Sequence, residues 1–423
     1  MSTFQTPTTT AERSEKFFTT PLLVIFLIVF IDLIGFGMVI PILPYYALHE
    51  PFMATPVEIG FIVSIYSWMQ FFFAPLLGSL SDKYGRRPVL FISLLGSAVG
   101  YVIIGLAATV TLVFVGRIVS GITGANISAA QAYIADVTSK ENRAKGMAMF
   151  GAAFGLGFIL GPAMAGILSK FSIQLPFYAA AGLSTVSAAS VYFFLPESLS
   201  PGNRVTSKAS RGFAAVAILF RDHAFAFINT IYFLLVTSFS IMTYAFVLYT
   251  AVRFGYNAEQ NGYLFAFVGV IAVLAQGLLY GPLVNAFGET RLAAVGCLFM
   301  AASLFLIPLV GPAAGGLPAL LGVCVLLSLG NALASPSLTG LGSKVSHEER
   351  QGSSLGVMQS GASLARAVGP MIGGFLLDNA VDQIDEHTIY RTFWTASAIM
   401  VAAMFTAVYF AITYGKRPDA ATS

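Results

Sequence analysis

Three charged side chains lie well inside long apolar runs of this chain, and they are its strongest candidates for chemistry. They are Asp32, Arg117 and Arg366. A charge at the centre of a bilayer costs roughly 2.5–3.5 kcal/mol even on the lenient insertion scale, so each needs a partner or a wet cavity. A long basic side chain can reach toward the interface, but a short aspartate in mid-span cannot. Asp32 is therefore the first candidate for a functional group.

Depth along the helices decides whether Asp32 and Arg117 can meet. Asp32 lies 12 residues into its run, which is about 18 Å at 1.5 Å per residue. Arg117 lies about 10 Å below the opposite face by the same rise, so in a core of about 30 Å both fall in the outer half. One interpretation is a structural ion pair. The preferred one is a proton-responsive carboxylate whose proton affinity changes when the arginine moves, because Asp32 is the only mid-span acid.

Arg366 and a set of uncharged polar residues are further candidates to line a cavity or contact a substrate. Arg366 lies about 21 Å along its run, and no acid lies within the spans of its own half. Three roles of Arg366 stay open: it pairs with Asp32, it receives an anionic group of the substrate, or it donates hydrogen bonds to backbone carbonyls. The amides are interpreted mostly as interhelical contacts worth about 0.6 kcal/mol each, with one or two touching substrate: Gln70, Asn126, Gln131, Asn229, Gln276, Asn331 and Gln359.

The elements that position these residues are predicted to be transmembrane helices. Of the 423 residues 57% are hydrophobic and 10% charged, whereas a soluble domain carries about 25% charged residues. A helix needs about 20 apolar residues to cross a membrane, and β-barrel alternation is absent. Twelve runs meet or nearly meet that length: 20–44, 57–79, 88–108, 110–134, 145–168, 174–195, 224–250, 260–282, 291–310, 316–338, 352–377 and 391–413.

The distribution of basic residues predicts the orientation. Outside the spans, 17 of the 22 Lys and Arg fall on the side of the N-terminus, and three, Lys170, Arg253 and Arg391, fall on the other. The positive-inside rule therefore predicts that both termini lie in the cytoplasm. The protein is expected to be a multi-pass protein of the cell (inner or plasma) membrane.

The chain also repeats itself. Gly78, Asp82 and Gly85 follow the second run at a spacing that Gly281, Asn285 and Gly288 copy after the eighth. Gly161-Pro162 with Gly166 is likewise copied by Gly369-Pro370 with Gly374. Duplication across a membrane is the signature of a secondary transporter. We expect an all-α protein of two pseudo-symmetric six-helix bundles: tail 1–19, bundle 20–195, linker 196–223, bundle 224–413 and tail 414–423.

Several classes of function are disfavoured. The four histidines lie outside the apolar runs and the two cysteines have no metal-ligand spacing, so no metal site is expected. Net charge is only +3 with no basic, aromatic-interleaved cluster, which argues against nucleic acid. No nucleophile–base spacing suggests an enzyme. No cofactor is expected beyond a proton gradient, and the protein is expected to be a monomer that handles protons and a small molecule within a bilayer.

The run from Gly78 to Pro88, GSLSDKYGRRP, resembles the cytoplasmic loop signature of the major facilitator superfamily. Gly157-x-x-x-Gly161-Pro162-x-x-x-Gly166 resembles the antiporter motif of its 12-span drug:proton exporters. Arg117-x-x-x-Gly121 is similar to their proton-transfer motif, and Asp32 in its run looks like the acidic first span of tetracycline-type exporters. The resemblance implies a fold of two six-helix halves and proton coupling through Asp32 and Arg117.

The same resemblance implies a latch that holds one conformational state. Its residues are Gly78, Asp82, Gly85, Arg86, Arg87 and Arg143. Asp82 either caps the start of span 11 (352–377) or pairs with Arg143 across the cytoplasmic face. The alternative is that Asp82 serves only as a topological anchor and turn former. In the second half Asn285 replaces the acid and Glu289-Thr290 replaces two arginines, so that loop is a degenerate copy.

The sequence thus predicts a secondary transporter that exports small amphipathic, possibly tetracycline-like compounds in exchange for protons. An importer or facilitator of a sugar, an organic acid or another metabolite is the first alternative. A membrane receptor or scaffold without transport is the second, although it would have no need of a buried acid and arginine.

Overall fold

The protein is all-helical over the residues that the structure describes, which are 19–49, 51–139, 142–199, 222–345, 351–379 and 384–414 of this computed structural model. The predicted linker is described only at 196–199 and 222–223. The helices are α1 (Thr20–Leu48), α2 (Pro56–Tyr84), α3 (Arg86–Gly105), α4 (Val110–Thr123), α5 (Ile127–Val137), α6 (Arg143–Ser169), α7 (Leu175–Phe194), α9 (His223–Phe254), α10 (Ala258–Leu274), α11 (Gly281–Phe287), α12 (Glu289–Leu306), α13 (Gly316–Val345), α14 (Gln351–Leu377) and α15 (Glu386–Tyr414).

Two spans are interrupted. A 3₁₀ turn at Gly124–Asn126 joins α4 to α5, and a π-helical turn at Ala275–Tyr280 joins α10 to α11. Such interruptions often mark functional places in a helix. Within the described residues eleven helical segments are long and apolar enough to cross a membrane, and α14 is a further long helix. The predicted all-α architecture of two helical bundles is confirmed.

The start of the second span in each half is set by the same capping device. The Thr55 hydroxyl accepts from the Glu58 backbone N–H at 3.2 Å, and the Glu58 carboxylate accepts from the Thr55 N–H at 2.9 Å. Asn257 and Gln260 form the matching box at the start of α10, at 3.0 and 2.9 Å. Because each box satisfies two otherwise free backbone donors, it fixes where the helix begins. The internal repeat therefore extends to the caps.

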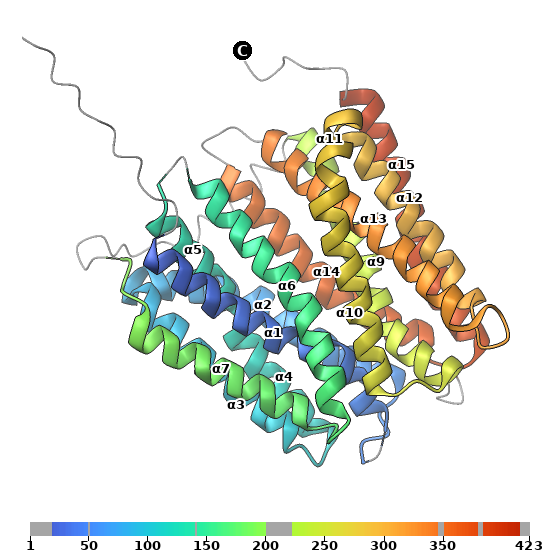
Figure 1. Ribbon diagram of the computed structural model, residues 1–423, viewed down its shortest axis with the longest axis horizontal. Helices are drawn as coiled ribbons and strands as arrows, with labels where there is room; N and C mark the ends of the chain where they lie inside the picture. The colour runs from blue at the N-terminus through green and yellow to red at the C-terminus, as the bar shows by residue number, and fades with distance from the viewer. Residues whose placement is uncertain are drawn as a thin grey trace, which may run out of the picture.

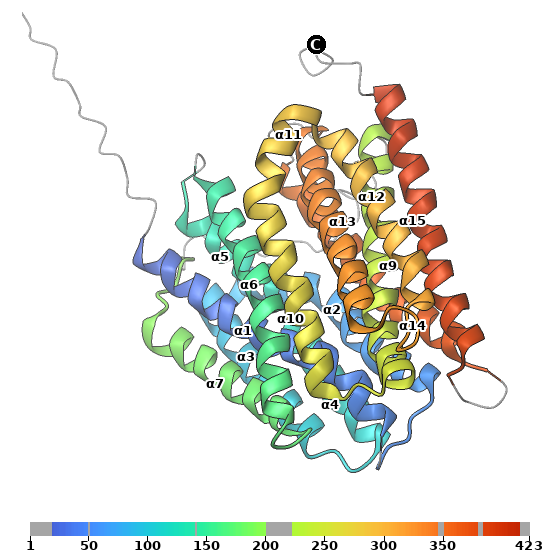
Figure 2. The same cartoon turned by 45° about the vertical axis from the view of Figure 1, so that its right-hand side comes forward.

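The two halves touch along one part of their length. α6 packs on α10 and α2 packs on α14. The contacts lie mostly toward the end opposite the termini, where Lys170 Nζ is 3.1 Å from the Glu259 carboxylate and the Tyr244 hydroxyl donates to the Pro56 carbonyl. At the terminal end, where α1 begins and α15 ends, α5 and α11 lie apart (Figure 1; Figure 2).

Beyond the π turn, the face of α10 and α11 that carries Gly277, Gly281 and Gly288 has no close neighbour among the described residues. A Cβ added at Gly277, Gly281 or Gly288 would meet no heavy atom within 4 Å. Leu278 is 68% exposed. The structure is therefore closed between the halves at the end opposite the termini and separated at the terminal end.

Candidate functional site

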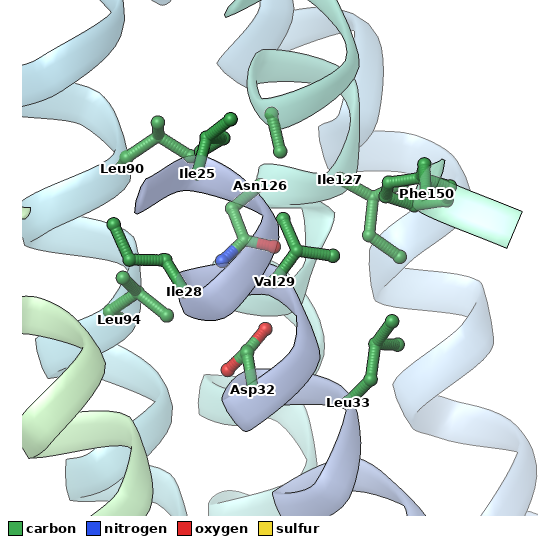
Figure 3. A pocket seen from close by; sticks show the side chains of 11 residues that line it. Ile25, Ile28, Val29, Asp32, Leu33, Leu90, Leu94, Asn126, Ile127 and Phe150 are labelled. Atoms are coloured by element: carbon green, nitrogen blue, oxygen red, sulfur yellow. The ribbon is translucent and has the colours of Figure 1, made fainter. Parts of the chain in front are cut away.

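A small cavity opens beside Asp32 inside the N-terminal half (Figure 3). Its volume is about 20 Å³, which is room for about one water molecule. Its lining brings α1, α3, α5 and α6 together, and Asp32 and Asn126 are its polar members. The other lining residues are Ile25, Ile28, Val29, Leu33, Leu90, Leu94, Ile127, Ala130 and Phe150.

The Asp32 carboxylate faces the interior of its own half. Asn126, in the 3₁₀ turn, and Ser184, on α7, are its polar neighbours. The Ser184 hydroxyl is buried and makes no hydrogen bond of good geometry with the described residues. A carboxyl group with neutral neighbours and a single-water cavity can hold or release a proton without breaking an ion pair. That arrangement suits a proton carrier better than a structural anion.

Arg117 does not form an ion pair with Asp32, so the pairing suggested by depth is wrong for this state. Its Nε donates to the Ile62 carbonyl at 3.2 Å and its Nη2 to the Val63 carbonyl at 3.3 Å. Its guanidinium lies 4.5 Å from the ring centroid of Tyr66. The rise per residue gives height but not direction around a helix, and Arg117 points to α2 while Asp32 points to α5 and α7.

Tyr66 is a central residue that was not among the predicted site residues. It is 6% exposed, and its hydroxyl interacts electrostatically with Asp32, Arg117 and Arg366, from both halves. Space for it comes from Gly124, where a Cβ would overlap the hydroxyl. The nearby Gln70 side chain donates to the Gly124 carbonyl at 3.0 Å, which holds the 3₁₀ turn. Its position could have identified it as a site residue, because Tyr66 lies one turn before the candidate Gln70 on the same face of the helix.

Arg366 lies on α14 in the C-terminal half and does not reach Asp32. Its Nη2 donates to the Ser363 hydroxyl at 3.1 Å, and Tyr232 and Tyr66 are its electrostatic neighbours. Pairing with Asp32, one of its three predicted roles, is absent here. The remaining polar candidates scatter: Asn229 is buried, Gln131, Asn331 and Gln359 are half-buried, and Gln276 is exposed in the π turn.

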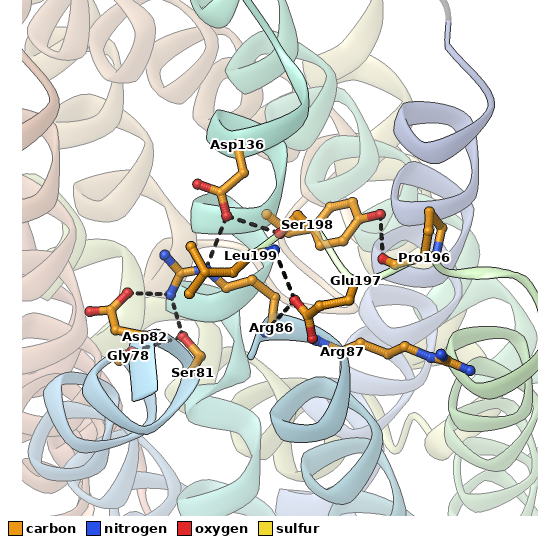
Figure 4. Close-up of polar contacts among 11 residues, drawn as sticks. Gly78, Ser81, Asp82, Arg86, Arg87, Asp136, Pro196, Glu197, Ser198 and Leu199 are labelled. Atoms are coloured by element: carbon orange, nitrogen blue, oxygen red, sulfur yellow. Dashed lines mark hydrogen bonds and ion pairs between the residues drawn. The ribbon is translucent and has the colours of Figure 1, made fainter. Parts of the chain in front are cut away.

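The predicted latch is assembled within the N-terminal half (Figure 4). Arg86 is 7% exposed and donates to the Asp82 carboxylate, to the Ser81 hydroxyl at 2.6 Å and to Asp136 on α5 at 3.2 Å. Among the described residues Asp82 therefore pairs with Arg86, four residues on. The side chain of Arg143, its predicted partner, lies outside the described residues.

Glu197 completes this cluster by capping α3. Its carboxylate accepts from the backbone N–H groups of Arg86 at 2.9 Å and Arg87 at 3.2 Å (Figure 4). A carboxylate at a helix N-terminus is favoured by the free N–H groups and by the helix dipole. The Arg87 side chain turns outward and donates to the Tyr192 carbonyl. The loop after α2, the end of α5 and the segment after α7 are thereby joined into one rigid corner.

The glycine–proline motif of α6 packs against two helices, α1 of its own half and α10 of the other half. Gly157 and Gly161 pack on α1, where a Cβ on Gly161 would lie 2.7 Å from Gly37. Gly166 instead meets the other half, because a Cβ on Gly262 of α10 would lie 2.6 Å from Gly166 Cα and 2.7 Å from the Pro162 carbonyl. Of this motif, Pro162 and Gly166 therefore lie where the halves meet.

The second half repeats this arrangement. Gly369 packs on α9 of its own half, whereas Gly374 and the Pro370 carbonyl meet Gly60 of α2, where a Cβ would lie 2.6 Å from the Pro370 oxygen. The halves are thus joined by two equivalent backbone-to-backbone contacts. The partners Gly60 and Gly262 were missed, although each follows its capping box by the same number of residues.

Comparison with known proteins agrees with this architecture. The sequence matches the Major Facilitator Superfamily over residues 25–370 and 275–422. The chain belongs to the major facilitator superfamily. It is 31% identical to the tetracycline resistance protein, class H, of Pasteurella multocida, over 92% of this chain and 96% of the relative. It is 34% identical to the class C protein of Escherichia coli, over 83% and 88%.

A solved structure gives the same result. The human organic anion transporter MFSD10 (TETRAN) is 25% identical, has a TM-score of 0.68 and covers 92% of this chain and 99% of its own. The relatives of this superfamily member are transporters and not enzymes, so the protein is a membrane transporter.

Gly85 in the superfamily loop gives a first prediction. Its φ of 107° and ψ of 155° are adopted almost only by glycine, and a Cβ there would overlap the Glu197 carboxylate. Gly288 is the matched control, because its φ is 78° and nothing lies within 4 Å of its Cβ position. Gly85→Ala should lower the free energy of unfolding by about 1 kcal/mol more than Gly288→Ala, the worth of a helix cap. Equal losses in denaturation of the purified variants would mean that the Glu197 cap contributes little.

Proposed function

We propose that this transporter exports small amphipathic compounds in exchange for protons, by alternating access. The relatives named above are tetracycline resistance proteins, and a tetracycline-like compound is the substrate class to test first. The observation that carries the proposal is the half-buried Asp32 carboxyl, which lies beside a one-water cavity and forms no ion pair with the described residues. Coupling requires such a group, because it must gain and lose a proton in each cycle.

The packing of the halves supports alternating access. Contacts at Gly60–Gly374 and Gly166–Gly262 close one end, while the terminal end is separated. Since these contacts are backbone to backbone, two bundles can rock about them without repacking large side chains. The cluster around Arg86 joins the loop after α2, the end of α5 and the segment after α7, so it moves as a rigid part of its half. When each half moves as a rigid body, opening one end of the transporter closes the other.

Asp32 and Tyr66 supply the proposed link between the proton and the substrate. Tyr66 stands next to Arg117 in one half and Arg366 in the other. When the halves rock, the electrostatic surroundings of the Tyr66 hydroxyl change, and with them the field at Asp32. The carboxyl would bind a proton in one state and release it in the other.

We further propose a monomer in the cell membrane with both termini in the cytoplasm, so that the described state is open to the cytoplasm. Single cysteines test this orientation, and the two native cysteines are buried. Phe171, which is 78% exposed at the end opposite the termini, and Tyr84, 53% exposed at the terminal end, are suitable positions. An impermeant thiol reagent should label Phe171→Cys in intact cells and Tyr84→Cys only after lysis. The reverse pattern would invert the topology.

The proposed activity is tested in inverted membrane vesicles. Acidifying the lumen should drive accumulation of labelled tetracycline, and collapsing the pH gradient with a protonophore should release it. An importer would instead accumulate substrate in right-side-out vesicles. A receptor or scaffold would bind a ligand without any gradient-driven accumulation, and either result would refute export.

A further inference from the structure

Arg366 is a half-buried charge with few hydrogen-bonding partners among the described residues. Three charges lie in mid-span. Arg117 donates to two carbonyls and stacks on an aromatic ring, and Asp32 has polar neighbours in its own half. Arg366 donates to one neutral hydroxyl, that of Ser363. Among the described residues no carboxylate lies within 4.0 Å of it.

This shortage of partners has a physical consequence. A guanidinium carries five N–H donors and no acceptor, and a cation held within a membrane is costly unless it is paired or hydrated. A cation that no protein acid neutralises therefore provides a driving force for binding an external anion. Carboxylates and other planar oxyanions suit the fork of an arginine, which can donate two parallel hydrogen bonds to them.

The neighbours of Arg366 fit the rest of such a ligand. Tyr232 on α9 and Tyr66 on α2 are its electrostatic neighbours, so tyrosine hydroxyls of both halves lie near the guanidinium. Asn229, one turn before Tyr232, is 7% exposed, and its Oδ1 has no hydrogen-bond partner among the described residues. Hydroxyl and amide groups beside aromatic faces suit a flat ring system with polar substituents.

A polar path leads to Arg366 from the terminal end. On α14, Gly356 and Ser360 are exposed and Gln359 is half-buried, and the same face continues to Ser363 and Arg366. Ionisable residues within a span almost always face the bundle interior or a water-filled cavity, and this face of α14 carries one, Arg366. An amphipathic molecule entering between the separated ends of the halves would meet this face before it reached the guanidinium.

We propose that Arg366 is the substrate-recognition residue for an anionic group, and that this transporter selects amphipathic compounds that carry a carboxylate or an enolate. The proposal deepens and rests on the proposed export function. Because Tyr66 belongs to the other half, an anion held by Arg366 also lies against the half that carries Asp32. The charge of the bound substrate can therefore influence the proton affinity of Asp32.

Direct binding to the purified full-length protein in detergent tests this proposal. The probes are rhodamine B, which carries a carboxylate, and its ethyl ester, which does not, and binding is followed by fluorescence anisotropy. Wild type should bind rhodamine B at least tenfold more tightly than the ester. A hydrogen bond to a charged group contributes enough that Arg366→Gln should weaken rhodamine B binding about ten- to a hundred-fold. Binding of the ester should stay unchanged, and Arg366→Lys should be intermediate.

Arg391→Gln serves as the control for loss of a positive charge, because Arg391 lies at the opposite end and donates to backbone carbonyls such as that of Leu376. It should leave both affinities unchanged. The proposal is overturned if wild type fails to bind rhodamine B or does not prefer it to the ester. It is also overturned if Arg366→Gln weakens both probes equally, the sign of a structural role. Should Arg366→Gln not fold, the acid-to-ester ratio in wild type and Arg366→Lys decides.

The outcome is independent of proton coupling. Anion selectivity through Arg366 without gradient-driven accumulation in vesicles would leave this site standing and refute export. Gradient-driven accumulation without anion selectivity would do the opposite.

Discussion

Replacing Asp32 by asparagine should abolish the accumulation of substrate against its gradient in inverted vesicles. Asparagine has nearly the same shape as a protonated aspartate, so the cavity and the contacts with Asn126 should be preserved. Because the amide cannot release a proton, a pH gradient no longer supplies energy to the transporter. Accumulation should fall to the equilibrium level, whereas binding in detergent should stay within about threefold of wild type, less than one hydrogen bond is worth. Gradient-driven accumulation by Asp32→Asn at the wild-type level would contradict this expectation.

Asp385→Asn is the matched control for this change. Asp385 lies in the loop before α15, where its carboxylate accepts from the Thr388 N–H at 2.7 Å. This hydrogen bond holds the pKa of Asp385 below its ordinary value, so the group stays ionised throughout the neutral range and cannot carry protons in the cycle. Asparagine caps a helix about as well as aspartate. Accumulation by Asp385→Asn should therefore match wild type.

Replacing Gly262 by valine should open the closed end and stop transport. A side chain at Gly262 would meet the backbone of Gly166 and Pro162 at 2.6 to 2.7 Å, and backbone atoms cannot rotate out of the way. The contact between α6 and α10 must then separate. We expect transport to fall more than tenfold and the population to shift toward the state open at the end opposite the termini.

Spin labels at Phe171 and Val252, which are exposed in different halves, report this opening as a longer distance. Gly182→Val is the control, because Gly182 lies within a helix and nothing lies within 4 Å of its Cβ position. It should change neither the distance nor transport. An unchanged distance and full transport in Gly262→Val would mean that this contact does not close the end.

Much of the fold followed from the sequence because hydrophobic length and repetition are local properties. Apolar runs predicted the helices, and the offset between the halves predicted two related bundles. The conformation of Gly85 was predictable because a tight loop between two helices leaves few other choices.

The side-chain pairings could not be predicted from the sequence, because they depend on the direction in which each side chain points from its helix axis. Asp32 and Arg117 have similar depths, yet they point to different helices, so their pairing was wrong for this state. Asp82 finds Arg86 because the chain places that arginine one turn away and α5 supplies Asp136 as a second partner. Tyr66 and Gly262 carry no charge, and their contacts with the other half are visible only when the two halves are placed together.

Proton release on substrate binding tests the central claim most directly. Purified protein in weakly buffered detergent, near the pH at which Asp32 is half protonated, is mixed with tetracycline while a pH indicator is monitored. Wild type should release protons on binding, and Asp32→Asn should bind tetracycline and release none. If Asp32→Asn releases as many protons as wild type, the coupling group lies elsewhere, and Asp32 has only a structural role.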